Sequence, residues 1–208
     1  PYRPKRRTRA QIARENGLEP LAQLIEEQGK ALLPLEQLAA MHLDEEKGIV
    51  TVEDAWQGAC DIVAENISDS AEVRKLLRKE LWNAGELVSE LIIDEKEAPE
   101  FLQYRDYSEP VRQLPPHRIL AMNRGEDKKA LKINLRCPDE KLIAKVAQKL
   151  NLKEQSPFYT YYHNALTDSY KRLLLPSLER ELRNELTEKA EKQAISVFAA
   201  NLRQLLLT

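Results

Sequence analysis

The residues best suited to chemistry in this chain are five cations near its beginning. Arg3, Lys5, Arg6, Arg7 and Arg9 have no acidic residue among them, although the 208-residue chain carries a formal net charge of only −2. Such a run is typical of a surface that contacts phosphate groups, and charge alone leaves a solvated leader as the alternative. We predict that these five side chains bind nucleic acid without sequence specificity.

The other reactive residues do not form a recognised catalytic motif. Asp61 and Glu65 have the spacing of neighbours on one helix face, but no third carboxylate or histidine accompanies them, which favours an exposed helix edge. His117 and Arg118 follow two prolines, and either a chemical site or a structural turn fits that pattern. Glycine-rich phosphate loops, nucleophile elbows and zinc-protease motifs are absent from the sequence. We therefore expect a protein that is not an enzyme.

Cysteine and histidine are too sparse to predict a metal centre. The only cysteines are Cys60 and Cys137, and the three histidines His42, His117 and His163 are far apart in the sequence. Helical spacing places Cys60 on a buried stripe, which predicts a core thiol. We expect no metal ion and no cofactor.

The amino-acid composition favours helices over sheet and predicts a soluble protein. Glycine occurs six times and aromatic residues make up 6% of the chain, while 32% of its residues are charged. No apolar run approaches the roughly 20 residues that a membrane-spanning helix needs, and the basic start lacks the apolar stretch of a secretory signal. A mainly α-helical, cytoplasmic protein without membrane association is expected.

Local signals predict most helix boundaries. Thr8 is a suitable N-cap for a helix that ends at Gly17, and Pro20 fits the first turn of a second helix that ends near Gly29. The segment 51–54 has the pattern of a capping box, followed by apolar residues at helical spacing up to residue 67. Another helix is expected from residue 68 or 69 to Gly85.

Strands are expected in two places. Residues 87–93 fit a strand or a continued helix, and periodicity does not decide between them. Residues 119–122 and 131–136 are predicted to form a β-hairpin, because the second segment alternates apolar and polar residues and 124–127 resembles a turn.

The last part of the chain is predicted to be helical. One helix follows Pro138, another begins near residue 156, and Pro176 is expected to break or kink the chain. Apolar residues then recur at helical spacing from Leu178 to Leu205, which predicts a long closing helix. Packing within the molecule and a dimeric coiled coil are both compatible with this pattern.

Four regions are expected along the chain. Residues 1–16 hold the basic leader and first helix, 17–115 form a helical region and 116–137 a small β-hairpin. Residues 138–208 form a second helical region that ends in the long helix and continues into further domains.

Several stretches of the sequence resemble the bacterial Tex transcription accessory proteins. They occur in order along almost the whole chain, at residues 2–22, 58–65, 104–110, 116–126, 168–181 and 199–207. One departure is Pro116, before His117 and Arg118, where the family usually has serine.

The resemblance implies a multi-helix array with a helix-turn-helix-like part, taken from a larger cytoplasmic factor that binds RNA or DNA mainly through domains after residue 208. It supplies no catalytic residue. The main hypothesis is therefore a non-catalytic helical scaffold that contributes to nucleic-acid binding. The alternative is a protein-interaction scaffold that contacts the transcription machinery or the protein's own downstream domains.

Overall fold

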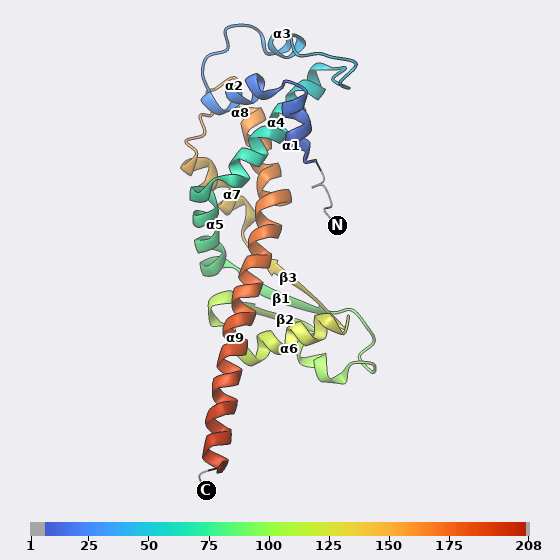
Figure 1. Ribbon diagram of the computed structural model, residues 1–208, viewed down its shortest axis with the longest axis vertical. Coiled ribbons are helices and arrows are strands. Elements are labelled where there is room, and N and C mark those ends of the chain that lie inside the picture. Colours follow the sequence, from blue (N-terminus) through green and yellow to red (C-terminus); the bar gives the residue numbers. More distant parts are fainter. Residues whose placement is uncertain (1–6, 207–208) are drawn as a thin grey trace. The chain divides into compact units, whose positions relative to one another are not determined.

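The structure, a computed structural model, describes residues 7–206 and is mainly helical (Figure 1). In order, its elements are α1 (Arg9–Glu15), α2 (Glu19–Glu27), α3 (Leu35–Ala40), α4 (Val52–Asp69), α5 (Ala71–Ala84), β1 (Glu86–Leu91), η1 (Pro99–Tyr104), β2 (Asp106–Pro110), η2 (Val111–Gln113), α6 (Pro116–Asp127), β3 (Leu131–Arg136), α7 (Asp139–Lys149), α8 (Tyr159–Asp168), η3 (Ser169–Leu174) and α9 (Leu175–Leu206).

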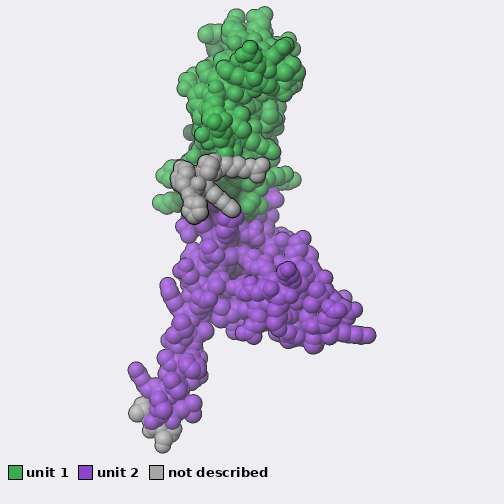
Figure 2. All heavy atoms as spheres, turned by 45° about the vertical axis from the view of Figure 1, so that its right-hand side comes forward, with its two compact units in different colours: residues 1–75, 140–176 green, residues 76–139, 177–208 purple. Residues whose placement is uncertain are grey.

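The chain divides into two compact units, which Figure 2 colours separately. Unit 1 combines residues 1–75 with 140–176, and unit 2 combines 76–139 with 177–208. Each unit therefore joins two stretches that are distant in the sequence. The four consecutive regions expected from the sequence did not anticipate this interleaving.

Unit 1 begins with two short helices that meet at a glycine. The Thr8 hydroxyl accepts a hydrogen bond from the Gln11 amide at 3.0 Å, and Gly17 has a φ of +85°. The predicted start and stop of α1 are therefore confirmed. α2 ends one residue before the predicted stop, because Gln28 itself adopts the left-handed conformation, with a φ of 52°. The Gln28 side chain forms hydrogen bonds with the backbone of Asn151 and Lys153, which hold this helix end in place.

α4 is the central helix of unit 1 and contacts α1, α2, α3 and α8. It begins with the predicted capping box, in which Thr51 and Asp54 exchange hydrogen bonds between side chain and backbone. Its long buried face includes Cys60, as the spacing predicted. Gly58 permits close packing with α1 and α2, since a Cβ there would lie 2.3 Å from the Leu18 side chain.

Pro176 does not break the helix. α8 passes into a π-helical segment, η3, in which the Leu175 amide donates to the Tyr170 carbonyl five residues earlier, and α9 begins at once. Where a π-helix changes to an α-helix, one backbone group has no hydrogen-bond partner within the helix. A proline, which lacks the N–H donor, therefore costs less stability at this position. The break, one of the two outcomes expected at Pro176, therefore does not occur.

Unit 2 contains a three-stranded antiparallel sheet in the order β2-β1-β3. Residues 86–91 form its central strand, which settles the choice between strand and helix left open by periodicity. Leu87 and Ser89 point to the buried face, opposite Leu135 and Ile133 of β3. The region 17–115, predicted as helical, thus supplies two of the three strands.

The predicted β-hairpin at 116–137 is wrong in its first half. Residues Pro116–Asp127 form the helix α6, and only Leu131–Arg136 is a strand, which pairs with β1. Gly125 was interpreted as a turn residue, but it lies in α6 where that helix closely approaches β3. A Cβ at this position would lie 2.5 Å from the Leu131 side chain. The glycine marks close packing, a second common reason for this residue.

The predicted long closing helix is confirmed as α9. Its first half packs within unit 2 through the buried residues Leu178, Leu182, Leu186 and Ala190. Residues 191–206 are exposed throughout, so packing within the described molecule explains only the first half of the leucine pattern. None of the helices within residues 7–206 is both long and apolar enough to span a membrane.

Candidate nucleic-acid interface

The structure places two of the five predicted phosphate-contacting residues. Arg3, Lys5 and Arg6 lie outside the described residues, whereas Arg7 and Arg9 stand just before and at the start of α1. The Arg7 guanidinium is paired with the Glu15 carboxylate at 3.2 Å, but 67% of its side chain remains exposed. Arg9 is exposed and forms no hydrogen bond or ion pair with any residue that the structure describes.

A third arginine of the same segment, Arg14, is fully engaged within unit 1. Its guanidinium donates to the Glu65 carboxylate at 2.6 Å, to the Asn66 amide oxygen at 2.7 Å and to the Glu19 carboxylate at 3.1 Å. The hydrogen bond to Glu65 raises the pKa of Arg14 further. Burial alone would raise the pKa of Glu65, but the hydrogen bonds from Arg14 and Thr8 outweigh it and lower that pKa. Arg14 therefore fixes α1 against α4.

Asp61 and Glu65 are not the exposed helix edge that their spacing suggested. Only 12% of the Asp61 side chain and 24% of the Glu65 side chain are exposed, and each carboxylate faces a different arginine. Arg172 of η3 binds the Asp168 carboxylate at 3.0 Å and lies 3.8 Å from Asp61. Burial nevertheless raises the pKa of Asp61, since it outweighs the neighbouring cations.

These groups surround a cleft of about 590 Å³ beside the first turn of α1. Three arginines line it, namely Arg9, Arg14 and Arg172, together with acidic residues of α4. Arg14 and Arg172 are paired directly with carboxylates, whereas Arg9 attracts Asp61 from farther away and forms no hydrogen bond or ion pair with a described residue. Of the three arginines that line the cleft, Arg9 is the exposed one.

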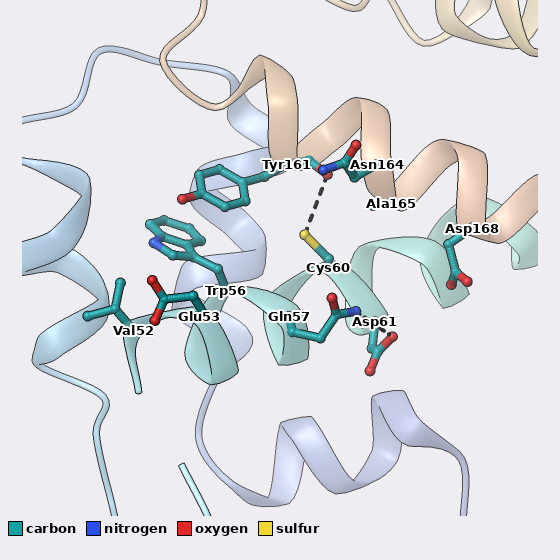
Figure 3. A pocket seen from close by; sticks show the side chains of 10 residues that line it. All are labelled: Val52, Glu53, Trp56, Gln57, Cys60, Asp61, Tyr161, Asn164, Ala165 and Asp168. Carbon is teal, nitrogen blue, oxygen red and sulfur yellow. Dashed lines mark hydrogen bonds between the residues drawn. The ribbon is translucent and has the colours of Figure 1, made fainter. Parts of the chain in front are cut away.

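A second cavity, of about 350 Å³, lies between α4 and α8 (Figure 3). The rings of Trp56 and Tyr161 stack there with centroids 4.4 Å apart. The Cys60 thiol donates to the Tyr161 carbonyl oxygen at 3.5 Å, and burial raises its pKa to about 12. A thiol that stays protonated near neutral pH is not a nucleophile, so this cavity offers binding rather than thiol chemistry.

Arg118 has a structural role, which was one of the two alternatives that the sequence left open. In unit 2 its guanidinium donates to the Tyr107 hydroxyl at 2.6 Å and to the Glu109 carboxylate at 3.0 Å. It also lies over the Tyr107 ring, 5.2 Å from the centroid. These contacts join α6 to β2. His117 occupies the first turn of α6, where the sequence had suggested a turn outside any helix.

Across residues 7–206, no group of three or more histidine, cysteine, aspartate or glutamate side chains is arranged to hold a metal ion.

Sequence reasoning missed two features of unit 1, the Arg14 network and the Trp56–Tyr161 cavity. Glu65 lies 51 residues from Arg14 and Tyr161 lies 105 residues from Trp56, so no local signal could have paired them.

Comparison with known proteins identifies the family. A family model described as "Tex central region-like" matches residues 31–198. The chain belongs to the Tex family. It is 39% identical over 213 residues to the protein YdcI of Bacillus subtilis, and 38% identical over 221 residues to the "Protein tex" of Bordetella pertussis. Each alignment covers 100% of this chain but only 29% and 28% of those relatives.

A human relative extends the comparison to animals. The "S1 RNA-binding domain-containing protein 1" of Homo sapiens is 34% identical over 215 residues, which covers 97% of this chain and 21% of the human protein. The Tex-family chain described here therefore spans less than a third of the length of these relatives.

Proposed function

We propose that this chain is a non-catalytic helical scaffold of a Tex-like transcription accessory factor and that it contributes to nucleic-acid binding. Arg3, Lys5, Arg6, Arg7 and Arg9 contact phosphate groups of RNA or DNA. The observation that carries the proposal is the contrast at α1, where Arg7 keeps 67% of its side chain exposed and Arg9 has no described partner, while Arg14 is bound to three side chains.

A rigid base for the cations supports this role. The Thr8 cap fixes the first turn of α1 and Arg14 fixes its last turn against α4, so a phosphate bound there would meet a preorganised helix. The names of two relatives, the "Transcriptional accessory protein Tex" of Neisseria gonorrhoeae and the human "S1 RNA-binding domain-containing protein 1", support a role in transcription and RNA binding. Phosphate contacts of this kind need no cofactor and no metal ion. We also propose that α1 and α2 have a helix-turn-helix-like role.

The test is a gel-shift titration at low salt with single-stranded RNA and double-stranded DNA. Replacing Arg3, Lys5, Arg6, Arg7 and Arg9 together with alanine should weaken binding at least about tenfold, because phosphate contacts supply most of non-specific affinity. A matched control removes five exposed cations elsewhere, namely Lys30, Lys79, Lys132, Lys141 and Lys192. Equal losses in both variants would show that overall charge, and not the α1 surface, determines binding.

A second candidate function is a protein-interaction scaffold that contacts the transcription machinery or other domains of a longer Tex-family protein. The second half of α9 favours it. Ile195, Phe198 and Leu205 are 68%, 69% and 74% exposed and lie at helical spacing. Large apolar side chains grouped on one exposed face commonly mark a contact surface.

Comparing the 208-residue chain with a longer version of the protein tests this candidate. Replacing Phe198 with serine should leave the thermal unfolding midpoint of the 208-residue chain unchanged, since this side chain is exposed. In a version extended past Thr208 the same substitution should lower the midpoint if further domains cover the face. Equal midpoints in the extended version would count against an intramolecular contact there.

A further inference from the structure

The cavity between α4 and α8 of unit 1 is a second binding site that phosphate contacts do not use. It holds about 350 Å³ and has an aromatic floor, the stacked rings of Trp56 and Tyr161 (Figure 3). Its rim carries the carboxylates Glu53, Asp61 and Asp168. Carboxylates at the rim repel phosphate, so the occupant must be neutral or cationic.

Trp56 has an unused hydrogen-bond donor in this cavity. The side chain is 3% exposed, and its indole Nε1 has no hydrogen-bond partner in the part of the chain that the structure describes. Figure 3 shows the nitrogen on the ring edge that faces Val52 and Glu53. A buried N–H without an acceptor is destabilising, and a carbonyl oxygen from a ligand would satisfy it.

The charge on the rim is only partly compensated. Asp168 binds Arg172 directly, and Asp61 accepts from Gln57 at 3.4 Å and lies 3.8 Å from Arg172. Glu53 is exposed and forms no ion pair with another described residue. Three carboxylates against Arg172 and the more distant Arg9 leave the cavity negative, with Glu53 at one end and Asp61 at the other.

The length of the cavity indicates the form of its ligand. Glu53 and Asp61 are eight residues apart on α4, which corresponds to about 12 Å at the rise of an α-helix. In an extended peptide, four residue steps span roughly 13 Å, and residues i and i+4 project to the same face. Two basic side chains separated by three residues would therefore reach both ends at once, and their aliphatic stems would lie on the aromatic floor.

We propose that the α4–α8 cavity binds an extended segment of a partner protein with two basic residues separated by three others. One cation pairs with Glu53 and the other with Asp61, while a backbone carbonyl of the segment accepts the Trp56 Nε1 hydrogen bond. Asp61 also lines the cleft that contains Arg9, so the cavity is tested in a protein that keeps Arg9.

Tryptophan fluorescence tests the proposal directly. The chain has two tryptophans, so Trp82→Phe leaves Trp56 as the sole reporter. The probe is a capped pentapeptide with arginine at both ends and three alanines between them. It should change Trp56 emission in a saturable manner, and a peptide with glutamine in place of both arginines should not.

Glu53→Gln provides the matched variant, because this side chain is exposed and the substitution removes its charge while nearly keeping its size. It should weaken binding of the arginine peptide by about threefold, the size expected for one exposed ion pair. Glu46→Gln, an exposed loop residue outside the cavity, should have no effect.

Three outcomes would overturn the proposal: no saturable change, an equal change with the glutamine peptide, or equal affinity in the Glu53→Gln protein. A uridine hexanucleotide that produced the same change in Trp56 emission would also overturn it. The fate of the nucleic-acid proposal is decided separately, since the fluorescence experiment measures peptide binding in a protein that keeps all five cations at the start of the chain.

Discussion

Arg9 and Arg14 belong to the same short helix, α1, but their surroundings are opposite. Arg14 is bound to Glu65, Asn66 and Glu19, whereas Arg9 is exposed and has no hydrogen bond or ion pair among the residues described. The density of charge in the sequence predicts the same role for both residues. The difference teaches that one basic segment can both build a fold and leave cations for a ligand, and that substitutions should separate the two roles.

Loss of the Arg14 side chain should have the largest effect. Arg14→Ala removes three hydrogen bonds and leaves the mostly buried Glu65 carboxylate unpaired, which should lower the free energy of unfolding by about 2 kcal/mol. Urea unfolding followed by circular dichroism measures the change. Arg14→Lys, which keeps the charge but not the forked geometry, should lose part of this stability. A loss below about 0.5 kcal/mol would show that Arg14 does not anchor α1.

Arg172 offers a second test of an anchored arginine. Arg172→Ala leaves Asp61, of which 12% is exposed, without its nearby cation, and should reduce the free energy of unfolding by about 1 kcal/mol. The double variant Arg172→Ala with Asp61→Asn should recover part of the loss, because no buried charge then remains. Absence of any recovery would contradict the assigned role of the Asp61 charge.

The pairing of Arg14 with Glu65 should also appear as a pH dependence. The pKa of Glu65 is lowered from its ordinary value of 4.5 in the folded state, so its contribution to stability is complete above that value. It is lost as the pH falls through the lower, folded-state pKa. The stability difference between the native protein and Glu65→Gln should therefore shrink at acid pH. A difference that stayed constant below pH 4.5 would be inconsistent with a lowered pKa.

The smallest expected effect is that of Arg9. Arg9→Ala should leave the free energy of unfolding within about 0.5 kcal/mol, because the side chain is exposed. It should weaken RNA binding at low salt by about threefold, as expected for one lost phosphate contact. Urea unfolding and gel shifts on the same preparation separate the two effects. An unfolding change as large as that of Arg14→Ala would remove the contrast between the two arginines.

Local chemistry in the sequence predicted the elements whose boundaries depend on neighbouring residues. The Thr8 cap and the capping box at Thr51 are both set within four residues. Helical spacing likewise placed Cys60 in the core. Each of these features has a short-range physical cause.

The errors have long-range causes. Gly125 suggested a turn, but its small size is required by the approach of α6 to Leu131, which only the folded structure reveals. The continuation of the helix through Pro176 depends on the π-helical segment before it, and no residue pattern announces that segment. The partners of Arg14 were unpredictable for the same reason, since Glu65 and Asn66 are more than 50 residues away.

The salt dependence of RNA affinity tests the central claim most directly. A plot of the logarithm of the association constant against the logarithm of salt concentration should have a slope that becomes less negative by about 3 when Arg3, Lys5, Arg6, Arg7 and Arg9 are alanine, while Arg14→Lys should leave the slope unchanged. An unchanged slope in the five-alanine variant would contradict the account, because phosphate contacts at the start of α1 would then be absent.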